Sequence, residues 1–451
     1  MHHARFDVRP PVLLAPLALC LVAAAAGAAA LAGSGPVRAA APEAPPGVLL
    51  TVERPSSPGS RPGADRTAGR PARFGAAAVL LPDLSGDGVP ELAVAAPDQP
   101  VPSSDSSPPV GRSGRVHVAD GATGELTDVW QAPTPASPDD TSAGGGQFGR
   151  RLFVAGDVTG DRYVEVGVEE RGRLHLVSLR GRRSAVVTAT FTGVARAWPW
   201  PDRDGDGRGE LLLRRSGQGG LRVVDPGDGR VLSRIEVGGA AVRVVGDVTG
   251  DGIPELLDGR ILLDPATGRR VVELQIDAAP ADAVRLDDLD GDGRPDLAVA
   301  LSGSVHLVST GTGRTLARLA RPIDAEPGAF PSGLAAADDF DGDGRVDLVV
   351  GDLPTGPHAP PDAAGTTTPA GPDESWLHLF SGADGRHLAT FATGDLGLPP
   401  LTGLLGTTPD RDRDGRRDLL VGGGRRHVTG AGGSELVPGA VLWLSGSLLE
   451  P

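Results

Sequence analysis

The chain has 451 residues and a formal net charge of −15, with 67 Gly, 42 Pro, 39% hydrophobic and 3% aromatic residues. This apolar content supports a core that turn-forming residues divide into short segments. Because phosphate binding needs clustered positive charge, the acidic balance excludes nucleic acid and an anionic membrane surface as partners.

Residues 1–46 are predicted to be an export segment followed by an Ala/Pro-rich linker. Arg5 and Arg9 precede an apolar run over residues 12–32, and small residues suited to cleavage follow it. The run is also long enough to span a bilayer, so a cleaved signal peptide and an uncleaved anchor helix both remain open. Either way the rest of the chain is expected to be exported, as a secreted protein or one tethered to the outer face of the membrane. Cys20, the single cysteine, lies in this run, so the folded part contains no disulfide.

Seven acidic segments form an internal repeat in the remaining chain. Each has acidic residues at positions 1, 5 and 9 and an apolar residue at position 10, as in DLSGDGVPEL and DLDGDGRPDL. We number these loops one to seven in chain order. The loops begin at Asp83, Asp157, Asp202, Asp247, Asp288, Asp339 and Asp410. Their spacing corresponds to a unit of ~45 residues plus insertions, which suits one four-stranded propeller blade.

Short apolar segments surround every acidic loop. One precedes it, and two follow, such as ELAVAA and then RVHVADG in the first repeat. A Thr-Gly or Asp-Gly turn and a fourth apolar piece complete the unit, which is the pattern of a hairpin. The sequence therefore predicts an all-β domain over residues 47–451, a seven-bladed β-propeller with few free strand edges.

The ends of this domain are predicted to pair with each other. The seventh repeat has a third strand at 441–445 but no fourth. The apolar stretch 47–54 (GVLLTVER) has no other assignment, so we expect it to be the closing strand beside 441–445.

The acidic nonapeptide followed by a strand resembles the FG-GAP repeats of the integrin alpha-subunit head and of bacterial secreted and cell-surface proteins. The resemblance covers residues 74–451. Phe74-Gly75 and Phe148-Gly149 match the dipeptide that names the family, and Ala96-Pro97 fits its later part. The resemblance implies an integrin alpha-like propeller whose acidic loops bind calcium, as in a bacterial-type member of the family.

Calcium takes six to eight oxygen ligands, which side chains at positions 1, 3, 5 and 9 of a curled loop can supply. Four loops offer four carboxylates, and three have Ser or Thr at position 3. The predicted ligands are Asp83, Ser85, Asp87, Glu91; Asp157, Thr159, Asp161, Glu165; Asp202, Asp204, Asp206, Glu210; Asp247, Thr249, Asp251, Glu255; Asp288, Asp290, Asp292, Asp296; Asp339, Asp341, Asp343, Asp347; and Asp410, Asp412, Asp414, Asp418. Of these up to seven Ca²⁺ sites, the one at Asp157 is expected to be the weakest, because Arg162 stands where Gly is expected.

The sequence favours a binding, adhesion or interaction module over an enzyme. Four histidines share one slot in the third strand, but equivalent positions on different blades are too far apart to act together. These histidines are His117, His175, His306 and His378. The part of the chain beyond the leader has no G-x-S-x-G, H-E-x-x-H or P-loop motif. A propeller-fold polysaccharide lyase or hydrolase and a purely structural envelope module remain the alternatives.

A protein or glycan ligand is expected on the face opposite the acidic loops, and the prediction for the assembly is a monomer. Long polar segments leave that face at 97–114, 131–147, 352–375 and 422–439. Loops on a rigid scaffold are common binding sites, although their low hydrophobicity also suits disordered spacers. Membrane contact is expected only through residues 1–46, if that segment is not cleaved.

Overall fold

The chain consists of two compact units, Met1–Glu43 and Ala44–Pro451, and the second unit carries all the residues described below. In the computed structural model these are residues 47–53, 73–100, 113–133, 146–180, 185–239, 242–322, 329–353, 375–428 and 434–450. The predicted export segment 1–46 lies outside them. Within these ranges no helix has the length and apolar character that crossing a membrane requires.

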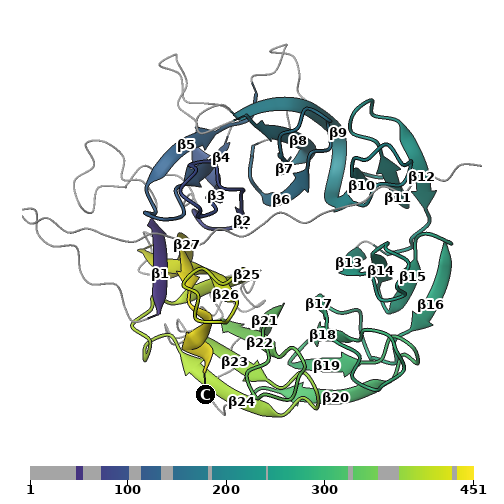
Figure 1. Ribbon diagram of the computed structural model, residues 1–451, viewed down its shortest axis with the longest axis vertical. Helices are drawn as coiled ribbons and strands as arrows, with labels where there is room; N and C mark the ends of the chain where they lie inside the picture. The colour runs from purple at the N-terminus through teal and green to yellow at the C-terminus, as the bar shows by residue number, and fades with distance from the viewer. Residues whose placement is uncertain are drawn as a thin grey trace, which may run out of the picture. The chain divides into compact units, whose positions relative to one another are not determined.

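The described strands of the second unit form six antiparallel sheets, and five of these sheets have four strands each. These five are β2 (Ala78–Leu80), β3 (Leu92–Pro100), β4 (Ser113–Ala119) and β5 (Leu126–Trp130); β13 (Val242–Gly246), β14 (Glu255–Asp258), β15 (Ile261–Asp264) and β16 (Arg269–Glu273); β17 (Asp282–Arg285), β18 (Leu297–Leu301), β19 (Ser304–Val308) and β20 (Thr315–Ala320); β21 (Ala329–Ala336), β22 (Leu348–Leu353), β23 (Trp376–Phe380) and β24 (His387–Ala392); and β25 (Leu401–Thr408), β26 (Asp418–Val428), β27 (Ser434–Leu444) and β1 (Val48–Glu53). Figure 1 shows the sheets of this unit following one another in chain order around a common centre. A series of four-stranded antiparallel sheets arranged in this way is a β-propeller.

The sixth sheet has seven strands because one long strand belongs to two repeats. Its members are β6 (Arg151–Gly156), β7 (Glu165–Glu170), β8 (Gly172–Leu179), β9 (Ala185–Trp200), β10 (Glu210–Arg215), β11 (Leu221–Val224) and β12 (Val231–Ile235). The first part of β9 pairs with β8 and its last part with β10, and Val194 is paired with both neighbours. Counting β9 in both repeats, the described strands form seven groups of four.

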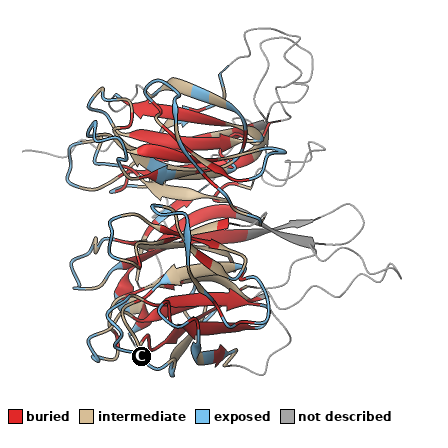
Figure 2. Ribbon diagram, turned by 90° about the vertical axis from the view of Figure 1, so that its right-hand side faces the viewer, coloured by how far each residue is buried: buried red, intermediate tan, exposed pale blue. Residues whose placement is uncertain are grey.

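The core of this unit is divided into seven apolar clusters, one between each pair of successive strand groups. One of them joins the last group to the first, since Leu420 and Trp443 pack there with Phe74 and Leu92. The other six join the remaining neighbours in chain order. Figure 2 shows the buried residues along the strands and the exposed residues mainly in the connections. Each group is therefore stabilised by burial against both neighbours.

The two ends of the unit meet in one sheet, as the sequence predicted. β1 pairs antiparallel with β27, with Leu50 opposite Trp443 and Val52 opposite Val441. Val52 is fully buried and Leu50 is 7% exposed. The N-terminal strand thus supplies the fourth strand that the last repeat lacks.

The prediction of a long loop over 422–439 was wrong. β26 and β27 continue their pairing as far as Val428 opposite Ser434, so this insertion is an extended hairpin. The backbone groups of the two strands that face each other are paired in this hairpin, although the segment is polar. The three other predicted long loops, over 97–114, 131–147 and 352–375, lie mostly outside the described residues.

The acidic loops connect the first and second strand of each group and share one backbone shape. In all seven loops the residues at positions 4 and 6 have a positive φ. Twelve of these fourteen residues are Gly, which adopts this conformation without strain. The exceptions are Arg162 (φ 72°) and Arg413 (φ 63°).

Deleting residues 47–54 is expected to destabilise the whole propeller. The deletion exposes the edge of β27 and removes the buried side chains of Leu50 and Val52. Burial of two such side chains contributes roughly 3–6 kcal/mol. A denaturant titration of the truncated and complete chains measures this loss, and identical midpoints would show that β1 does not close the ring.

Two point variants in β1 separate core packing from other effects of the strand. Val52→Ala is expected to lower the free energy of unfolding by about 2 kcal/mol, because it empties part of a packed site. Thr51→Ala is the matched control, since Thr51 is exposed on the same strand and its truncation should leave stability nearly unchanged.

Replacing Arg162 or Arg413 by Gly is expected to stabilise the protein by roughly 1 kcal/mol each, because a left-handed backbone costs a non-glycine residue about 1–2 kcal/mol. Thermal melts of the two variants check this. Arg294→Gly is the control, because exposed Arg294 lies at position 7 of the fifth loop outside the left-handed region. A similar gain in the control would contradict the explanation by backbone strain.

Candidate metal centres

The aspartate at position 1 organises the backbone of each acidic loop. In all seven loops its two carboxylate oxygens accept hydrogen bonds from the backbone N–H groups at positions 4 and 6, at 2.5–3.0 Å. These bonds curl the loop around the carboxylate and require the positive φ values. In the first loop the N–H of Gly88 contributes most to lowering the pKa of Asp83.

The acid at position 9 is buried at the start of the second strand. Its exposed fraction is at most 3% in every loop. In all seven loops one of its oxygens accepts a hydrogen bond from the backbone N–H at position 2, at 2.6–3.0 Å. Position 9 therefore closes the loop from the strand side, as the sequence predicted for a ligand that re-enters there.

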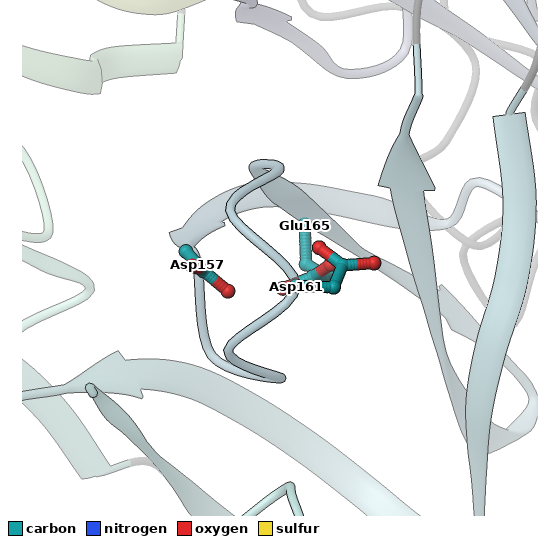
Figure 3. A group of neighbouring side chains, drawn as sticks. All are labelled: Asp157, Asp161 and Glu165. Atoms are coloured by element: carbon teal, nitrogen blue, oxygen red, sulfur yellow. The ribbon is translucent and has the colours of Figure 1, made fainter. Parts of the chain in front are cut away.

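The predicted ligands do converge in several loops. In each converging group, one oxygen from each of three carboxylates lies within 4.8 Å of the others. These groups include Asp157, Asp161 and Glu165; Asp202, Asp204 and Asp206; Asp247, Asp251 and Glu255; Asp288, Asp290 and Asp296; and Asp339, Asp341 and Asp347. Figure 3 shows the group of the second loop on the curled connection between β6 and β7. Donor sets made only of oxygen suit a hard cation such as Ca²⁺.

The position-5 carboxylate has a second role in the loop. In all seven loops its Oδ1 accepts the backbone N–H at position 7. In the sixth loop the Oδ2 of Asp343 also accepts a hydrogen bond from Ser381 Oγ, at the end of β23, at 3.4 Å. In the seventh loop Asp414 Oδ2 accepts from Ser445 Oγ at 2.8 Å.

The third loop contains a buried oxygen that a cation would satisfy. Glu210 is 2% exposed, and its Oε2 is buried with no hydrogen-bond partner among the described residues. An unpaired buried carboxylate oxygen costs free energy, and the converging Asp202, Asp204 and Asp206 add like charge beside it. The residues of this loop therefore fit a bound Ca²⁺.

Burial and like charge oppose ionisation of five position-9 acids, those of the third to seventh loops, in the metal-free protein. Burial raises the pKa of Asp347 and of Asp418 to about 6, and neighbouring loop carboxylates add to the effect. Burial also raises the pKa of Glu210, Glu255 and Asp296. A bound cation would remove this penalty by placing positive charge next to the carboxylates.

In the second and fourth loops a threonine at position 3 contacts the position-9 acid, whereas Ser85 of the first loop donates to Asp83. There Thr159 Oγ1 donates to Glu165 Oε1 at 3.1 Å, and Thr249 Oγ1 donates to Glu255 Oε1 at 2.9 Å. In these loops a hydroxyl proton satisfies the position-9 acid directly. The second loop also carries Arg162 in the left-handed region, and its place as the weakest site stays a prediction.

The shared histidine slot of the third strand has a packing role. His117, His175 and His378 are buried, and each ring lies 5.4–5.6 Å from the ring of a phenylalanine in its own repeat. These phenylalanines are Phe74, Phe148 and Phe330. In the second and sixth repeats the ring Nδ1 also contacts a Thr hydroxyl of the fourth strand. The expectation from the sequence that these histidines do not form a shared site agrees with this geometry.

Sequence reasoning missed Arg411, at position 2 of the seventh loop. Its guanidinium donates to Leu49 O in β1 at 3.0 Å and to Ala122 O in the first repeat at 3.3 Å. It also lies 4.9 Å from the centre of the Trp443 ring. Arg411 thus connects an acidic loop to the seam where the chain ends meet. The Arg at this position was visible in the sequence, but its partners are distant along the chain.

Comparisons with solved structures found several similar chains. A crystal structure of BBS1N in complex with ARL6DN is 12% identical, with 83% of this chain and 92% of that chain covered and a TM-score of 0.46. The Dos1 propeller is 11% identical, with coverage of 79% and 76% and a TM-score of 0.42. The exotype rhamnogalacturonan lyase YesX is 15% identical, with coverage of 82% and 61% and a TM-score of 0.45. At TM-scores of this size, these likenesses assign neither an activity nor a partner to the chain.

A search of curated proteins found no significant match. Residues 288–350, which include the fifth and sixth acidic loops, match the FG-GAP-like repeat family. This match confirms the resemblance inferred from the acidic nonapeptides. The chain is a β-propeller that contains an FG-GAP-like repeat.

Proposed function

We propose that this protein is an exported, seven-bladed, calcium-binding propeller that acts by binding a protein or glycan and not by catalysis. The observation that carries the calcium part is the third loop, where three aspartates converge, Asp202 and Asp204 act electrostatically on Glu210, and the buried Oε2 of Glu210 is unpaired among the described residues. The same loop architecture recurs seven times, with the carboxylates of positions 1 and 9 held by backbone N–H groups. Seven strand groups and seven inter-group clusters support the blade number.

Calcium would have a structural role in this protein. Up to four carboxylates per loop face a small volume, and their mutual repulsion opposes the curled loop when no cation is present. A dication bound by positions 1, 3, 5 and 9 would join the first and second strands of each blade. Because these ligands come together only in the folded chain, the free energy of binding would add to the stability of the fold.

The proposed binding role rests on which connections between strands are not occupied by acidic loops. The acidic loops occupy the first-to-second strand connections, so a ligand would bind at the opposite face, in the arc of the first, sixth and seventh blades. A glycan array and a pull-down with the complete chain in calcium test this proposal. Selective capture of one partner class supports a binding module, and turnover of a captured glycan would instead identify an enzyme.

The histidine slot supports a role without catalysis. A catalytic imidazole needs access to a substrate, whereas His175 is 1% exposed and has both ring nitrogens engaged by Thr190 and Glu170. His378 is likewise fully buried between Thr390 and Asp352. These two imidazoles are thus committed to the blade interiors.

Removing calcium is expected to lower the melting temperature by roughly 10 °C, because each site saturated at about 100 times its Kd contributes about 2.7 kcal/mol. Thermal melts in chelator, and again after calcium is restored, measure the effect. Restoration with calcium but not with magnesium would support the assignment, since Mg²⁺ demands a smaller octahedral site. An unchanged melt in chelator would contradict the structural role.

The stabilisation by calcium is expected to grow with pH around pH 6. In the metal-free fold the pKa of Asp347 and Asp418 is about 6, above the ordinary value of 3.8. These two groups therefore stabilise the metal-free fold below about pH 4, and this contribution is lost as pH rises through about 6. Calcium needs the ionised carboxylates, so the rise in melting temperature that calcium causes should be small at pH 5 and complete at pH 7.5.

Comparing metal-stripped protein with and without added calcium at each pH removes the contribution of other titrating groups. Burial lowers the pKa of His117 to about 4, but this residue lies outside the acidic loops and affects both samples equally. The variant Asp418→Asn should lose part of the calcium effect at pH 7.5. A calcium effect of equal size at pH 5 and pH 7.5 would show that these carboxyls do not bind the ion.

A further inference from the structure

The residue just before position 1 separates the acidic loops into two kinds. It is Asp in the fifth and sixth loops, at Asp287 and Asp338. In the other loops it is a residue without a side-chain acceptor: Pro82, Gly156, Pro201, Gly246 and Pro409. The predicted calcium ligands do not include Asp287 or Asp338, so these carboxylates are available for other contacts.

Asp287 connects the fifth loop to the sixth. Its carboxylate Oδ2 accepts a hydrogen bond from the backbone N–H of Val346 at 3.0 Å. Val346 directly precedes Asp347, the buried position-9 acid of the sixth loop. The backbone carbonyl of Asp287 accepts from the N–H of Asp296, the position-9 acid of its own loop, at 3.1 Å. Asp287 thus contacts the backbone at or next to the position-9 acid in both the fifth and the sixth loop.

Asp338 makes the same connection from the sixth loop to the seventh. Its carboxylate accepts the backbone N–H of Arg417, which directly precedes Asp418. Its carbonyl accepts from the N–H of Asp347 at 3.2 Å. We call these two contacts, from the Asp287 or Asp338 carboxylate to the next loop, the inter-loop links.

Arg416 reinforces the second link. Its guanidinium donates to the backbone carbonyl of Asp339, at position 1 of the sixth loop. It also lies 4.7 Å from the centre of the Phe340 ring. The side chain of Arg416 is 26% exposed, so these contacts are partly shielded from water. Two contacts therefore join the sixth loop to the seventh. Position 8 of the seventh loop contacts Asp338, and position 7 contacts positions 1 and 2 of the sixth loop.

We propose that Asp287 and Asp338 are positioning residues that couple calcium binding in the fifth, sixth and seventh loops. This inference rests on the proposed calcium function. A cation that orders one loop fixes the acidic residue before its position 1, and the link then fixes the backbone next to the position-9 ligand of the next loop. Because coupling between binding sites is reciprocal, each of the three loops raises the affinity of its linked neighbours. Loops with Pro or Gly at that position bind independently.

Trp443 provides a signal from the seventh loop. Its indole N–H donates to Oδ2 of Asp418 at 3.0 Å, and the ring is 1% exposed. Calcium binding at Asp418 changes the partner of this indole, so its fluorescence reports occupancy of that loop. The contribution of Trp443 is obtained for each variant as the difference from the same variant carrying Trp443→Phe.

The test removes the sixth site and measures the seventh. Asp341→Ala with Asp343→Ala, at positions 3 and 5 of the sixth loop, is expected to raise the calcium midpoint of the Trp443 signal about fivefold. The matched control is Asp204→Ala with Asp206→Ala, at the same positions of the unlinked third loop, and it should leave the midpoint unchanged. A thermal melt of each variant in saturating calcium shows that it is folded.

The link itself is tested by repeating the comparison with Asp338→Ala, which removes the acceptor. In that background, removal of the sixth site should no longer shift the Trp443 midpoint. Asp338→Asn keeps an acceptor oxygen and should restore the coupling, whereas Asp395→Ala, which removes an exposed acid elsewhere, should not affect it.

Two outcomes would overturn the coupling. Either the midpoint is the same with and without the sixth site in the otherwise natural chain, or the fivefold shift persists with Asp338→Ala. A failure of the proposed calcium function gives a different result, because calcium would then change neither the Trp443 signal nor the melting temperature of the natural chain.

Discussion

The structure of each repeat depends on a carboxylate that is buried at the first residue of the second strand or directly before it. Burying an acid is costly unless hydrogen bonds satisfy it, and here the loop backbone supplies the first donor at position 2. In the later repeats the other oxygen accepts an N–H from beyond the third strand: Thr310 for Asp296, Gly382 for Asp347 and Gly446 for Asp418. One side chain therefore ties the loop, the second strand and the end of the third strand together.

After the third strand, the backbone also lies very close to the acidic loop of the same repeat. A Cβ at Gly121 or Gly382 would lie only 1.8 Å from the carbonyl oxygen at position 8 of the same repeat, Pro90 or Val346. In the fifth repeat the corresponding residue is Thr310, whose hydroxyl donates to Pro295 O at 2.7 Å. Gly121 and Gly382 have no room for a side chain beside the carbonyl at position 8. In the fifth repeat Thr310 fits at this place, and its hydroxyl donates to that carbonyl.

The repeat unit and the closing strand could be predicted from the sequence, whereas the contacts between successive repeats could not. The acidic loops, their flanking strands and the closing strand follow from turn chemistry and from short apolar segments that recur in every repeat. The continuation of β9 through two repeats was not predicted, because Thr192 and Gly193 suit a turn as well as the change of partner at Val194. The contacts of Asp287 and Arg411 lie between repeats, so no local pattern indicates them.

The loops differ in whether the side chain at position 3 donates a hydrogen bond to the position-9 acid. In the second and fourth loops, the Thr159 and Thr249 hydroxyls donate to the position-9 glutamate, so a neutral donor already satisfies that oxygen. In the third loop a carboxylate replaces the hydroxyl, no proton is offered, and Glu210 Oε2 is left without a partner in the described residues. The fifth, sixth and seventh loops have the same four-carboxylate composition, with charge accumulating around a buried acid. The loops with four carboxylates carry the most charge around the buried acid and offer the most ligands for calcium, so a bound cation would stabilise the fold most at these loops.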